Sequence, residues 1–329
     1  MSLAEYIARR LLWAIPLLFV VSFIAFTIIQ LPPGDFITSL AAKLAESGQD
    51  LDMGTLDAMR ERYGLGDPFL VQYWKWISRV IVGDFGMSME WREPVSDLIW
   101  DRMALSFCVA AATILVVWAV ALPLGVYSAV QKYTAGDYII TAIGFIGLAI
   151  PNFLLAIFLL YVGVIYFGTE VSGLFSAQYA GAPWSWGKFV DLLSHLWVPV
   201  LILGTSSASS LIRIMRANLL DELPKPYVTT ARAKGLSEWH LLVRYPVRLA
   251  LSPFVSTIGW VFPSIISGSI ITDVVLSLPT AGPMMLQALK SQDMYLAGGF
   301  VLLLCVLSII GMLVSDILLG ILDPRVRYR

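Results

Sequence analysis

The longest stretch of the chain without a charged residue is YIITAIGFIGLAIPNFLLAIFLLYVGVIYFGT, residues 138–169. A helix needs roughly 20 mostly apolar residues to cross a bilayer, and this stretch exceeds that length. Backbone groups in lipid must be hydrogen-bonded within a helix or a closed barrel, and a barrel strand would alternate apolar with polar residues. Because the apolar residues here are continuous, the stretch predicts a membrane-spanning helix.

Five other stretches also lack Asp, Glu, Lys and Arg and are long enough to span a membrane, which makes six candidate spans. In chain order the five are 11–34, 103–131, 192–212, 249–272 and 294–315. The first exceeds the roughly 7–15 apolar residues of a signal-peptide core and is predicted to be a permanent span. A shorter uncharged stretch covers 274–289. Its Pro279, Gly282 and Pro283 disfavour a helix, so we predict an ordered loop that could re-enter the membrane.

The composition supports a membrane protein. Hydrophobic residues make up 58% of the 329-residue chain and charged residues only 14%, with a mean hydropathy of +0.79, whereas a soluble domain has about 25% charged residues. This excludes a soluble enzyme, a disordered regulator and a nucleic-acid binder, and a formal net charge of −1 gives no general attraction to anionic partners. Cys108 and Cys305 lie in separate apolar runs, so no disulfide framework is expected. The only histidines are His195 and His240, which are too few for a multi-histidine metal site.

Positively charged residues set the predicted orientation, because Lys and Arg accumulate in cytoplasmic loops. With the N-terminus inside, most cations of the short loops and chain ends fall on the cytoplasmic side. They are Arg9, Arg10, Lys132, the cluster from Arg213 to Arg248, and Arg325, Arg327 and Arg329. The short outer loops keep only Lys188 and Lys290. The sequence therefore predicts an all-α integral membrane protein with six transmembrane helices and with both the N- and the C-terminus in the cytoplasm.

These spans divide the chain into three parts. Residues 1–30 form a cytoplasmic N-terminus and the first span, and 31–102 form an extracytoplasmic domain between spans one and two. Residues 103–329 form a five-span core. The core contains a cytoplasmic loop from about 217 to 252.

The extracytoplasmic domain contains two predicted helices. The sequence Leu-Pro-Pro-Gly-Asp at 31–35 ends the first span. Residues 57–63 are predicted to be helical, ending at Gly64, and 69–82 carry apolar residues at helical spacing. That apolar stripe is Val71, Trp74, Ile77, Val80 and Ile81. It is expected to form the core of a small domain or a helix at the membrane surface, or else a platform for an extracytoplasmic partner.

The loop between spans four and five has the sequence features of a folded unit. Pro224 and Pro226 favour a helix start, and residues 227–234 are predicted to form a short helix. Gly235 fits the C-terminal cap of that helix, and Ser237 fits the N-cap of a second one. A basic tether that only fixes the topology would explain the charges of this loop but not the paired caps. We therefore predict a helix–Gly–helix elbow that docks a cytoplasmic protein.

The sequence lacks the motifs of a self-contained enzyme or carrier. It contains no G-x-x-x-x-G-K-[ST] loop to hold a nucleotide phosphate, no H-E-x-x-H and no G-x-S-x-G, so no catalytic residue is expected. Fixed charges are nearly absent from the spans, and Asp273 and Asp316 lie at the ends of uncharged stretches. Because many proton-coupled carriers rely on intramembrane carboxylates, the energy for any transport is expected to come from another chain.

Small and hydroxyl-bearing residues are concentrated in spans four and five. They would allow either close helix packing or a polar pore wall, and the sequence leaves both open. The candidates for a translocation path are Thr205, Ser206, Ser209, Trp260, Ser264, Ser267 and Asp273. The hydroxyl groups of such a wall would offer weak, uncharged hydrogen bonds to a passing solute.

Several motifs at matching spacings are similar to those of one transporter family. They are Arg9-Arg10-Leu11-Leu12, Pro16-Leu17-Leu18, Pro33-Gly34-Asp35, Tyr63-Gly64-Leu65, Pro68, Gln72-Tyr73, Gly83-Asp84-Phe85-Gly86-Met87-Ser88, Ile150-Pro151-Asn152-Phe153 and Leu322-Asp323-Pro324-Arg325. The most specific stretch is Tyr227-Val228-Thr229-Thr230-Ala231-Arg232-Ala233-Lys234-Gly235-Leu236-Ser237, which is similar to the family's cytoplasmic "EAA" loop. By these motifs, which cover nearly the whole chain, the sequence resembles the permease subunits of the dipeptide/oligopeptide/nickel class of ABC importers, specifically the B-type subunit.

Two places depart from the family pattern. Thr229-Thr230-Ala231 stands where the general motif has Glu-Ala-Ala, a replacement that is common in this subclass. After Asp273 the family usually has a Phe followed by Pro-Gly, where this chain has Leu276 and Pro279-Thr280-Ala281-Gly282. The second departure concerns the detail of that loop and not the assignment.

The resemblance implies a type I ABC importer permease architecture and half of a translocation channel in the bacterial inner membrane. The family pairs this subunit with a second, related permease, two ATP-binding subunits and an extracytoplasmic solute-binding protein, which would dock on 31–102. ATP and Mg²⁺ would be used by the ATPases, so this chain would need no cofactor of its own. Its elbow would be the coupling loop, formed by Thr229, Thr230, Ala231, Arg232, Ala233, Lys234, Gly235, Leu236, Ser237 and Glu238.

The resemblance leaves the solute open. Peptides are the default of the family, which also contains carriers of nickel, oligosaccharides and sugar–amino-acid conjugates. From the residues alone, two other functions also remain: an ion-coupled secondary carrier that works without partners, and a membrane scaffold without transport.

Overall fold

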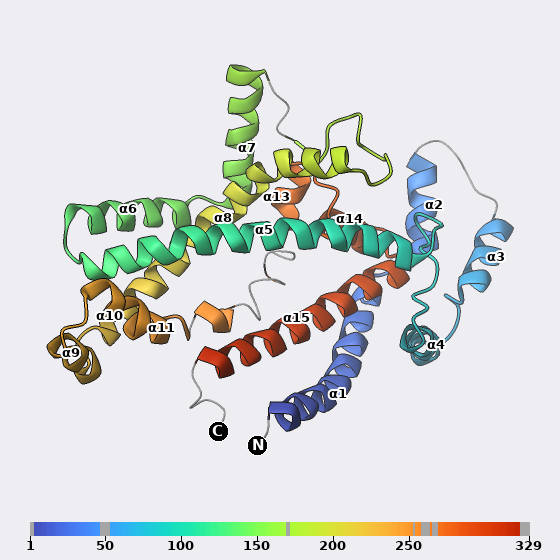
Figure 1. Ribbon diagram of the computed structural model, residues 1–329. Helices are drawn as coiled ribbons and strands as arrows, with labels where there is room; N and C mark the ends of the chain where they lie inside the picture. Colours follow the sequence, from blue (N-terminus) through green and yellow to red (C-terminus); the bar gives the residue numbers. More distant parts are fainter. Residues whose placement is uncertain are drawn as a thin grey trace. The chain divides into compact units, whose positions relative to one another are not determined.

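The computed structural model is all-helical in the part of the chain that it describes (Figure 1). The described residues are 3–46, 53–168, 172–252, 254–257, 264 and 269–322. The helices are α1 (Leu3–Gln30), α2 (Phe36–Glu46), α3 (Met53–Tyr63), α4 (Phe69–Ile81), α5 (Val95–Val130), α6 (Ala135–Ala149), α7 (Asn152–Val162), η1 (Gly163–Phe167), α8 (Trp186–Glu222), α9 (Pro226–Ala233), α10 (Glu238–Arg244), α11 (Pro246–Ala250), α13 (Ile270–Val275), α14 (Ala281–Lys290) and α15 (Met294–Leu322). For these residues the expected all-α class is confirmed.

Several of these helices are long and apolar enough to cross a membrane. The four that qualify singly are Ile7–Gln30, Val95–Val130, Trp186–Glu222 and Met294–Gly320. A fifth candidate is the pair formed by α6 and the helix that follows it, which are bent by 95° to each other. The predicted span 249–272 lies mostly outside the described residues, so the count of six spans stays a prediction.

The longest uncharged stretch is therefore a bent pair of helices and not one straight span. Ile150, the residue after α6, has extended dihedral angles (φ −85°, ψ 118°), as the ring of the following Pro151 favours. Pro151 is in turn the N-cap of α7. Continuous hydrophobicity indicates how much chain is buried in lipid, but it does not reveal a bend.

The chain divides into two compact units. The large unit comprises Met1–Ala8, Phe107–Pro279 and Ser308–Arg329, and the small unit comprises Arg9–Ser106 and Thr280–Leu307. The small unit thus contains the predicted 31–102 domain together with most of α1, with α14, and with the first parts of α5 and α15.

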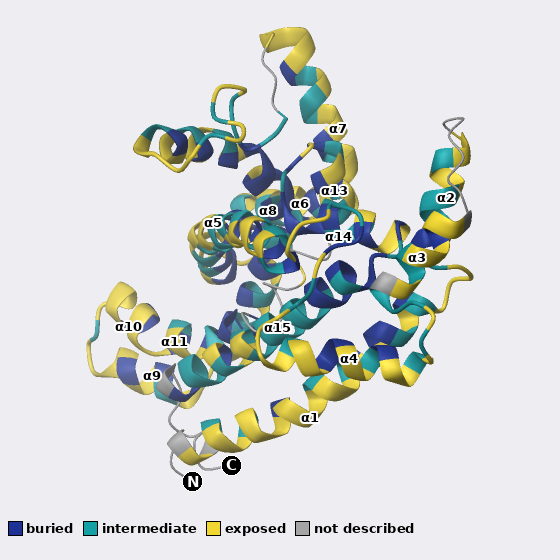
Figure 2. Ribbon diagram, turned by 90° about the vertical axis from the view of Figure 1, so that its right-hand side faces the viewer, coloured by how far each residue is buried: buried dark blue, intermediate teal, exposed yellow. Residues whose placement is uncertain are grey.

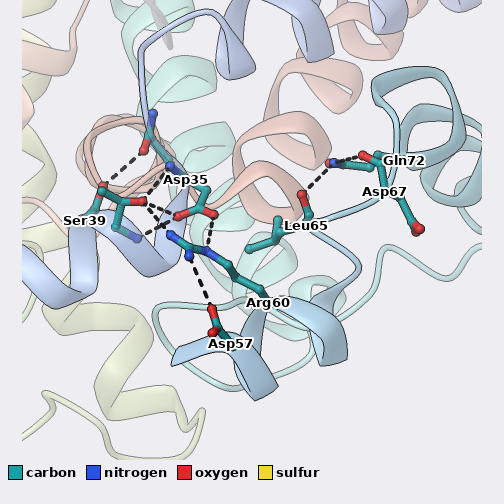
Figure 3. Close-up of polar contacts among 9 residues, drawn as sticks. Asp35, Ser39, Asp57, Arg60, Leu65, Asp67 and Gln72 are labelled. Atoms are coloured by element: carbon teal, nitrogen blue, oxygen red, sulfur yellow. Dashed lines mark hydrogen bonds and ion pairs between the residues drawn. The ribbon is translucent and has the colours of Figure 1, made fainter. Parts of the chain in front are cut away.

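In the small unit, residues 31–35 end α1 as predicted. A cluster of polar and charged side chains then joins the start of α2 to α3. Asp35 Oδ1 accepts a hydrogen bond from the Thr38 N–H at 2.7 Å, which caps α2. Arg60 Nε of α3 donates to Asp35 Oδ2 at 3.0 Å, and Arg60 Nη1 lies 3.6 Å from Asp57 (Figure 3). Burial raises the pKa of Asp35, but the hydrogen bonds from Thr38 and Arg60 outweigh it and hold this pKa below its ordinary value.

Both helices predicted in the extracytoplasmic domain are present, as α3 and α4. Gly64 follows α3 with φ +66°, the left-handed conformation expected of a C-terminal glycine. Gln72 of α4 fixes the turn between the two helices, because its Nε2 donates to Leu65 O at 3.1 Å and to Asp67 O at 2.8 Å (Figure 3).

The predicted apolar stripe of α4 is not a single buried face. Of its members Ile77 is buried, whereas Val71, Trp74 and Ile81 are exposed. The buried side chains of α4 are instead Gln72, Trp76 and Ile77. The stripe is therefore not the core of a small domain, and a membrane-surface helix and a partner platform remain as its alternatives.

The Gly83–Ser88 motif leads into a turn that is anchored on the start of α15. Ser88 Oγ donates to Asp293 Oδ2 at 2.6 Å, and the N–H groups of Met89 and Glu90 donate to the same oxygen at 2.8 and 3.1 Å. The other oxygen of this fully buried carboxylate accepts the N–H of the third residue of α15 at 3.2 Å. Burial raises the pKa of Asp293 above its ordinary value, against the effect of these hydrogen bonds.

The prediction of a loop over 274–289 is wrong for its second half. A helix, α14, runs from Ala281 to Lys290. Pro283 is the third residue of α14, where a backbone N–H has no partner within the helix, so proline is tolerated there. The Ala281 N–H donates to Ser106 Oγ at 2.8 Å, which fixes the start of α14.

The core of the large unit is a buried apolar cluster contributed by α5, α8 and the chain from the end of α11. Its members are Val117, Ala121, Ala129, Leu211, Ile212, Met215, Leu219, Ala250 and Phe254. We call this the central cluster. Because it joins transmembrane helices to the end of the α9–α11 loop, it places that loop relative to the spans.

Candidate functional site

The chain between α8 and α11 forms the predicted elbow, which consists of α9, α10 and the turn between them. Pro226 is the first residue of α9, and Gly235 follows α9 with φ +78°, a conformation that favours glycine. A Cβ at Gly235 would meet no atom within 4 Å, so the backbone angle and not crowding restricts this position. Ser237 is the N-cap of α10 as predicted, but its side chain makes no capping hydrogen bond. Arg232 and Glu238 join the two helices instead, with hydrogen bonds of 2.6 and 3.0 Å.

Three buried side chains give the elbow a small core of its own. They are Val228 and Ala231 from α9 and Leu241 from α10. The Tyr227 hydroxyl donates to Glu222 Oε2 at the end of α8, at 2.6 Å. Burial, and then the hydrogen bond to this carboxylate, raise the pKa of Tyr227 above its ordinary value. The elbow is therefore a folded unit tied to the end of α8.

Most of the predicted coupling residues lie on the exposed surface of the elbow. The exposed ones are Thr229, Thr230, Arg232, Ala233, Lys234, Gly235, Ser237 and Glu238. Ala231 is buried and Leu236 is half-buried, so these two hold the elbow together. Beside them Trp239 is 73% exposed, a large aromatic surface for a side chain in water. Of these exposed residues, Arg232 and Trp239 are of the types enriched at protein interfaces.

Helix α11 connects the elbow to the central cluster. It contacts both α10 and α8. Ala250 at the end of α11 and Phe254 beyond it belong to the cluster, as do Met215 and Leu219 of α8. Helix α11 therefore lies in contact with both the elbow and the helices of the central cluster.

A mostly apolar cavity of about 210 Å³ lies beside the central cluster, between α5 and α8. It is lined by Thr113, Ile114, Val117, Trp118, Ser206, Ser207, Ser210, Leu211, Ile214 and Ser264. Val117 and Leu211 belong to the cluster as well, and Trp118 packs against it. The described lining carries hydroxyl groups and a tryptophan but no charged residue. Of the predicted path residues, the structure brings Ser206 and Ser264 together here.

Two other predicted path residues, Thr205 and Ser209, face α6. A Cβ at Gly147 of α6 would lie 2.6 Å from Ser209 Oγ and 2.9 Å from Thr205 Cγ2, so the glycine allows a close approach. Both hydroxyls donate to carbonyl oxygens of their own helix, at 2.6 Å from Thr205 to Leu201 and at 2.7 Å from Ser209 to Thr205. In this structure the two residues serve helix packing, which was one of the two alternatives for them.

Of the three remaining path residues, the structure describes only Asp273. Asp273 is buried in α13, where it accepts a hydrogen bond from Ser269 Oγ at 3.1 Å, and α13 contacts α7. Trp260 and Ser267 lie outside the described residues. The role of these three residues in a path stays a prediction.

The sequence analysis missed a buried ion pair in the large unit. Arg216 Nε and Nη2 of α8 donate to Asp137 Oδ1 and Oδ2 of α6, each at 2.8 Å. The Ser128 hydroxyl and the Tyr133 N–H also donate to this carboxylate, which is 2% exposed. The signal in the sequence was opposite charges at the ends of two neighbouring apolar stretches. By its charge alone, Arg216 is predicted only as one of the cytoplasmic loop cations.

The sequence analysis also missed a contact of the helix break. Asn152, the first residue of α7, accepts a hydrogen bond from Ser206 Oγ at 3.2 Å. Ser206 also lines the cavity. Asn152 of the Ile150–Phe153 motif is therefore hydrogen-bonded to Ser206, a residue of the candidate path.

Family models match the chain almost from end to end. One, described as "Binding-prot-dependent transport system membrane comp, N-term", matches residues 3–110. The other, "Binding-protein-dependent transport system inner membrane component", matches residues 121–328. The chain belongs to this family. It is therefore a membrane permease subunit of a binding-protein-dependent ABC importer, a class of transport proteins and not of catalytic enzymes.

Full-length relatives support the same assignment for this permease. It is 33% identical over 331 residues to the oligopeptide transport system permease protein AppB of Bacillus subtilis (strain 168), with 99% of this chain and 100% of the relative covered. It is 31% identical over 327 residues to the glutathione transport system permease protein GsiC of Escherichia coli (strain K12), with 99% of each covered. The resemblance to peptide-class ABC importer permeases is thus confirmed.

A solved structure shows the same fold. A chain of the MetNI methionine ABC transporter, in inward-facing conformations, matches with a TM-score of 0.52 and 16% sequence identity. The match covers 69% of this chain and 96% of that chain. The permease therefore has the fold of an ABC importer membrane subunit.

Proposed function

We propose that this permease forms half of the translocation path of an ATP-driven importer of peptides or similar small solutes. The observation that carries the proposal is the elbow, a folded and exposed unit that is joined through α11 to the central cluster. The names of the full-length relatives AppB and GsiC, an oligopeptide and a glutathione permease, favour peptides as the solute.

The elbow provides a route from ATP hydrolysis to the path. An ATPase subunit docks on the exposed residues from Thr229 to Glu238, and its nucleotide-driven closure moves the elbow. The movement passes through α11 to the central cluster, because Ala250 and Phe254 are packed between α5 and α8. Val117 and Leu211 belong to both the cluster and the cavity lining, so a shift of the cluster reshapes the cavity.

The proposed assembly contains a second, related permease, two ATP-binding subunits that use ATP and Mg²⁺, and an extracytoplasmic solute-binding protein. The permease crosses a bacterial inner membrane six times with both ends in the cytoplasm, and the binding protein docks on the 31–102 domain. Within this assembly the chain itself holds no nucleotide. Labelling single cysteines in intact cells tests the orientation, because residues 225–245 must be inaccessible from outside.

The cavity lining suits a solute that is recognised without charge. Ser206, Ser207 and Ser210 offer hydroxyl groups, and Trp118 offers an aromatic face. Peptide amides and sugar hydroxyls can use the same groups, so oligosaccharides and sugar–amino-acid conjugates remain alternatives, as does nickel. Selection among such solutes then rests on the binding protein.

Gly235 tests the coupling role. At φ +78° a residue with a Cβ is strained by roughly 1–2 kcal/mol, and a β-branched one by more. Gly235→Val should therefore distort the elbow and abolish ATP-dependent uptake, while the amount of protein in the membrane is retained. Gly235→Asn is the matched control, because Asn tolerates this conformation and should keep most of the uptake. Uptake is measured in vesicles that contain the partner subunits and the binding protein.

Two results would contradict the proposal. Unchanged ATP-driven uptake by the Gly235→Val variant would remove the elbow from the coupling route. Solute movement down an ion gradient by the reconstituted chain alone would favour the secondary carrier instead.

A further inference from the structure

Helix α4 of the small unit packs one face against the end of α1. Phe23 and Phe26 of α1 meet Phe69, Tyr73 and Trp76 of α4. The ring centroids of these aromatic pairs are 5.1–5.8 Å apart. Trp76 is almost fully buried, with Gly298 of α15 also close to its ring. The aromatic cluster therefore fixes α4 against α1.

Polar contacts tie the same face of α4 to α1 at two more points. The Tyr73 hydroxyl shares a 2.9 Å hydrogen bond with Ser22 Oγ and lies 3.3 Å from Phe19 O. Gln30 Nε2 donates to Gln72 Oε1 at 2.8 Å. Helix α4 thus lies against residues 19–30, which are the last part of the apolar candidate span Ile7–Gln30.

A second face of α4 is apolar and exposed. Leu70, Trp74 and Ile81 are 65%, 67% and 64% exposed, and their spacing places them on one side of the helix. Ile28 of α1 and Leu31, the residue after α1, are likewise 61% and 77% exposed. Figure 2 shows exposed residues along both helices where they run together. Apolar surface beside the end of a membrane span is expected to meet lipid.

The charged residues of α4 lie on a different side. Lys75 and Arg79 are one turn apart and both exposed, and Lys75 Nζ lies 2.6 Å from Asp67 Oδ2. A helix with an apolar stripe, a tryptophan and separate basic residues is typical of helices that lie in the membrane interface. Basic side chains there extend toward lipid phosphates and water.

We propose that α4 is an interfacial helix whose exposed stripe of Leu70, Trp74 and Ile81 is buried in the lipid beside the end of α1. Lys75 and Arg79 face the phosphate headgroups. This proposal requires only that α1 crosses the membrane, and it does not depend on the transported solute or on ATP. If the proposal holds, the exposed stripe of Leu70, Trp74 and Ile81 is not part of the surface that a soluble binding protein contacts.

Spin labels at single cysteines test the proposal. The full chain with Cys108→Ser and Cys305→Ser is reconstituted in nanodiscs of phosphatidylethanolamine and phosphatidylglycerol. Labels are placed by Leu70→Cys, Trp74→Cys and Ile81→Cys on the stripe, and by Lys75→Cys and Arg79→Cys as matched controls on the same helix. Ile28→Cys on α1 supplies the reference for a lipid-facing site. Collision with oxygen reports lipid, and collision with water-soluble chromium oxalate reports water.

We expect the ratio of oxygen to chromium oxalate accessibility at 70, 74 and 81 to approach that at 28 and to exceed that at 75 and 79. Equal chromium oxalate accessibility at all five α4 positions would overturn the proposal, because the stripe would then face water. Labels at 70, 74 and 81 that neither reagent reaches would also overturn it, because a protein would then cover the stripe.

Discussion

The elbow of the large unit and α4 of the small unit both expose a tryptophan, but in different surroundings. Trp239 is 73% exposed and follows a run of exposed hydroxyl and charged residues. Trp74 is 67% exposed on an apolar stripe with Leu70 and Ile81. The elbow has its own small core, whereas α4 rests on a membrane span. The two proposals therefore assign different partners to the two exposed tryptophans, a protein to Trp239 and lipid to Trp74.

The largest expected effect comes from breaking the Asp137–Arg216 ion pair of the large unit. Arg216→Met leaves the buried Asp137 carboxylate without its charged partner, which should lower the free energy of unfolding by about 3–5 kcal/mol. Thermal unfolding in detergent measures the loss. Adding Asp137→Asn should recover much of it, because the unpaired charge is then gone. An Arg216→Met variant as stable as the wild type would show that the pair does not hold α6 to α8.

Truncating a side chain in the elbow should reduce transport more than truncating one on α4. Leu241→Ala empties part of a small core and should cost about 2–4 kcal/mol locally, with a clear loss of ATP-driven uptake. Trp74→Ala on α4 should leave uptake nearly unchanged, because α4 is not part of the proposed route from the elbow through α11 to the central cluster. Uptake assays and limited proteolysis of the elbow measure the two variants side by side. Equal losses of uptake in both variants would contradict the proposal that the elbow, and not α4, couples ATP hydrolysis to transport.

The smallest expected effect concerns Asp293, which anchors the turn after the Gly83–Ser88 motif. Asp293→Asn replaces a buried acceptor of several hydrogen bonds and should cost about 1–3 kcal/mol. Because burial raises the pKa of Asp293 above 3.8, the folded state binds this proton more tightly than the unfolded state. The stability of the wild type should therefore fall as pH rises from about 3.8 through the raised pKa.

The pH dependence provides the control for that variant. Asn cannot titrate, so the difference in unfolding midpoint between wild type and Asp293→Asn should vary with pH only in this window. Unfolding midpoints at several values between about pH 4 and pH 7 measure it. A difference that is constant with pH would show that Asp293 is not protonated more readily in the folded protein.

Helix ends were predicted well because they depend on local chemistry. Pro226 restricts its own φ to a helical value, and Gly235 allows the left-handed conformation that ends a helix, so the start and the end of α9 could be predicted from the sequence. The same holds for Gly64 after α3. The sequence alone was therefore enough to predict that the elbow is a structural unit.

Features that depend on which helices meet were predicted less well. The pairing of Asp137 with Arg216 joins α6 to α8, and no local pattern fixes which charges will meet. The face of α4 that is buried was misjudged because Phe26 of α1 packs on Trp76, and an apolar stripe alone does not say which neighbour covers it. Proline in a sequence predicts a helix break, but Pro283 lies in the first turn of α14, whose start is fixed by a hydrogen bond from Ala281 to Ser106.

The described residues that line the cavity between α5 and α8 carry no charge, which has a consequence for the resting membrane. Narrow apolar passages tend to expel water, and a passage without water conducts neither protons nor metal cations. Ile114, Val117 and Leu211 make part of the lining apolar, and the serine hydroxyls beside them carry no charge that would stabilise an ion. With this cavity on the translocation path, an idle importer would hold the ion gradient of the cell without needing a plug.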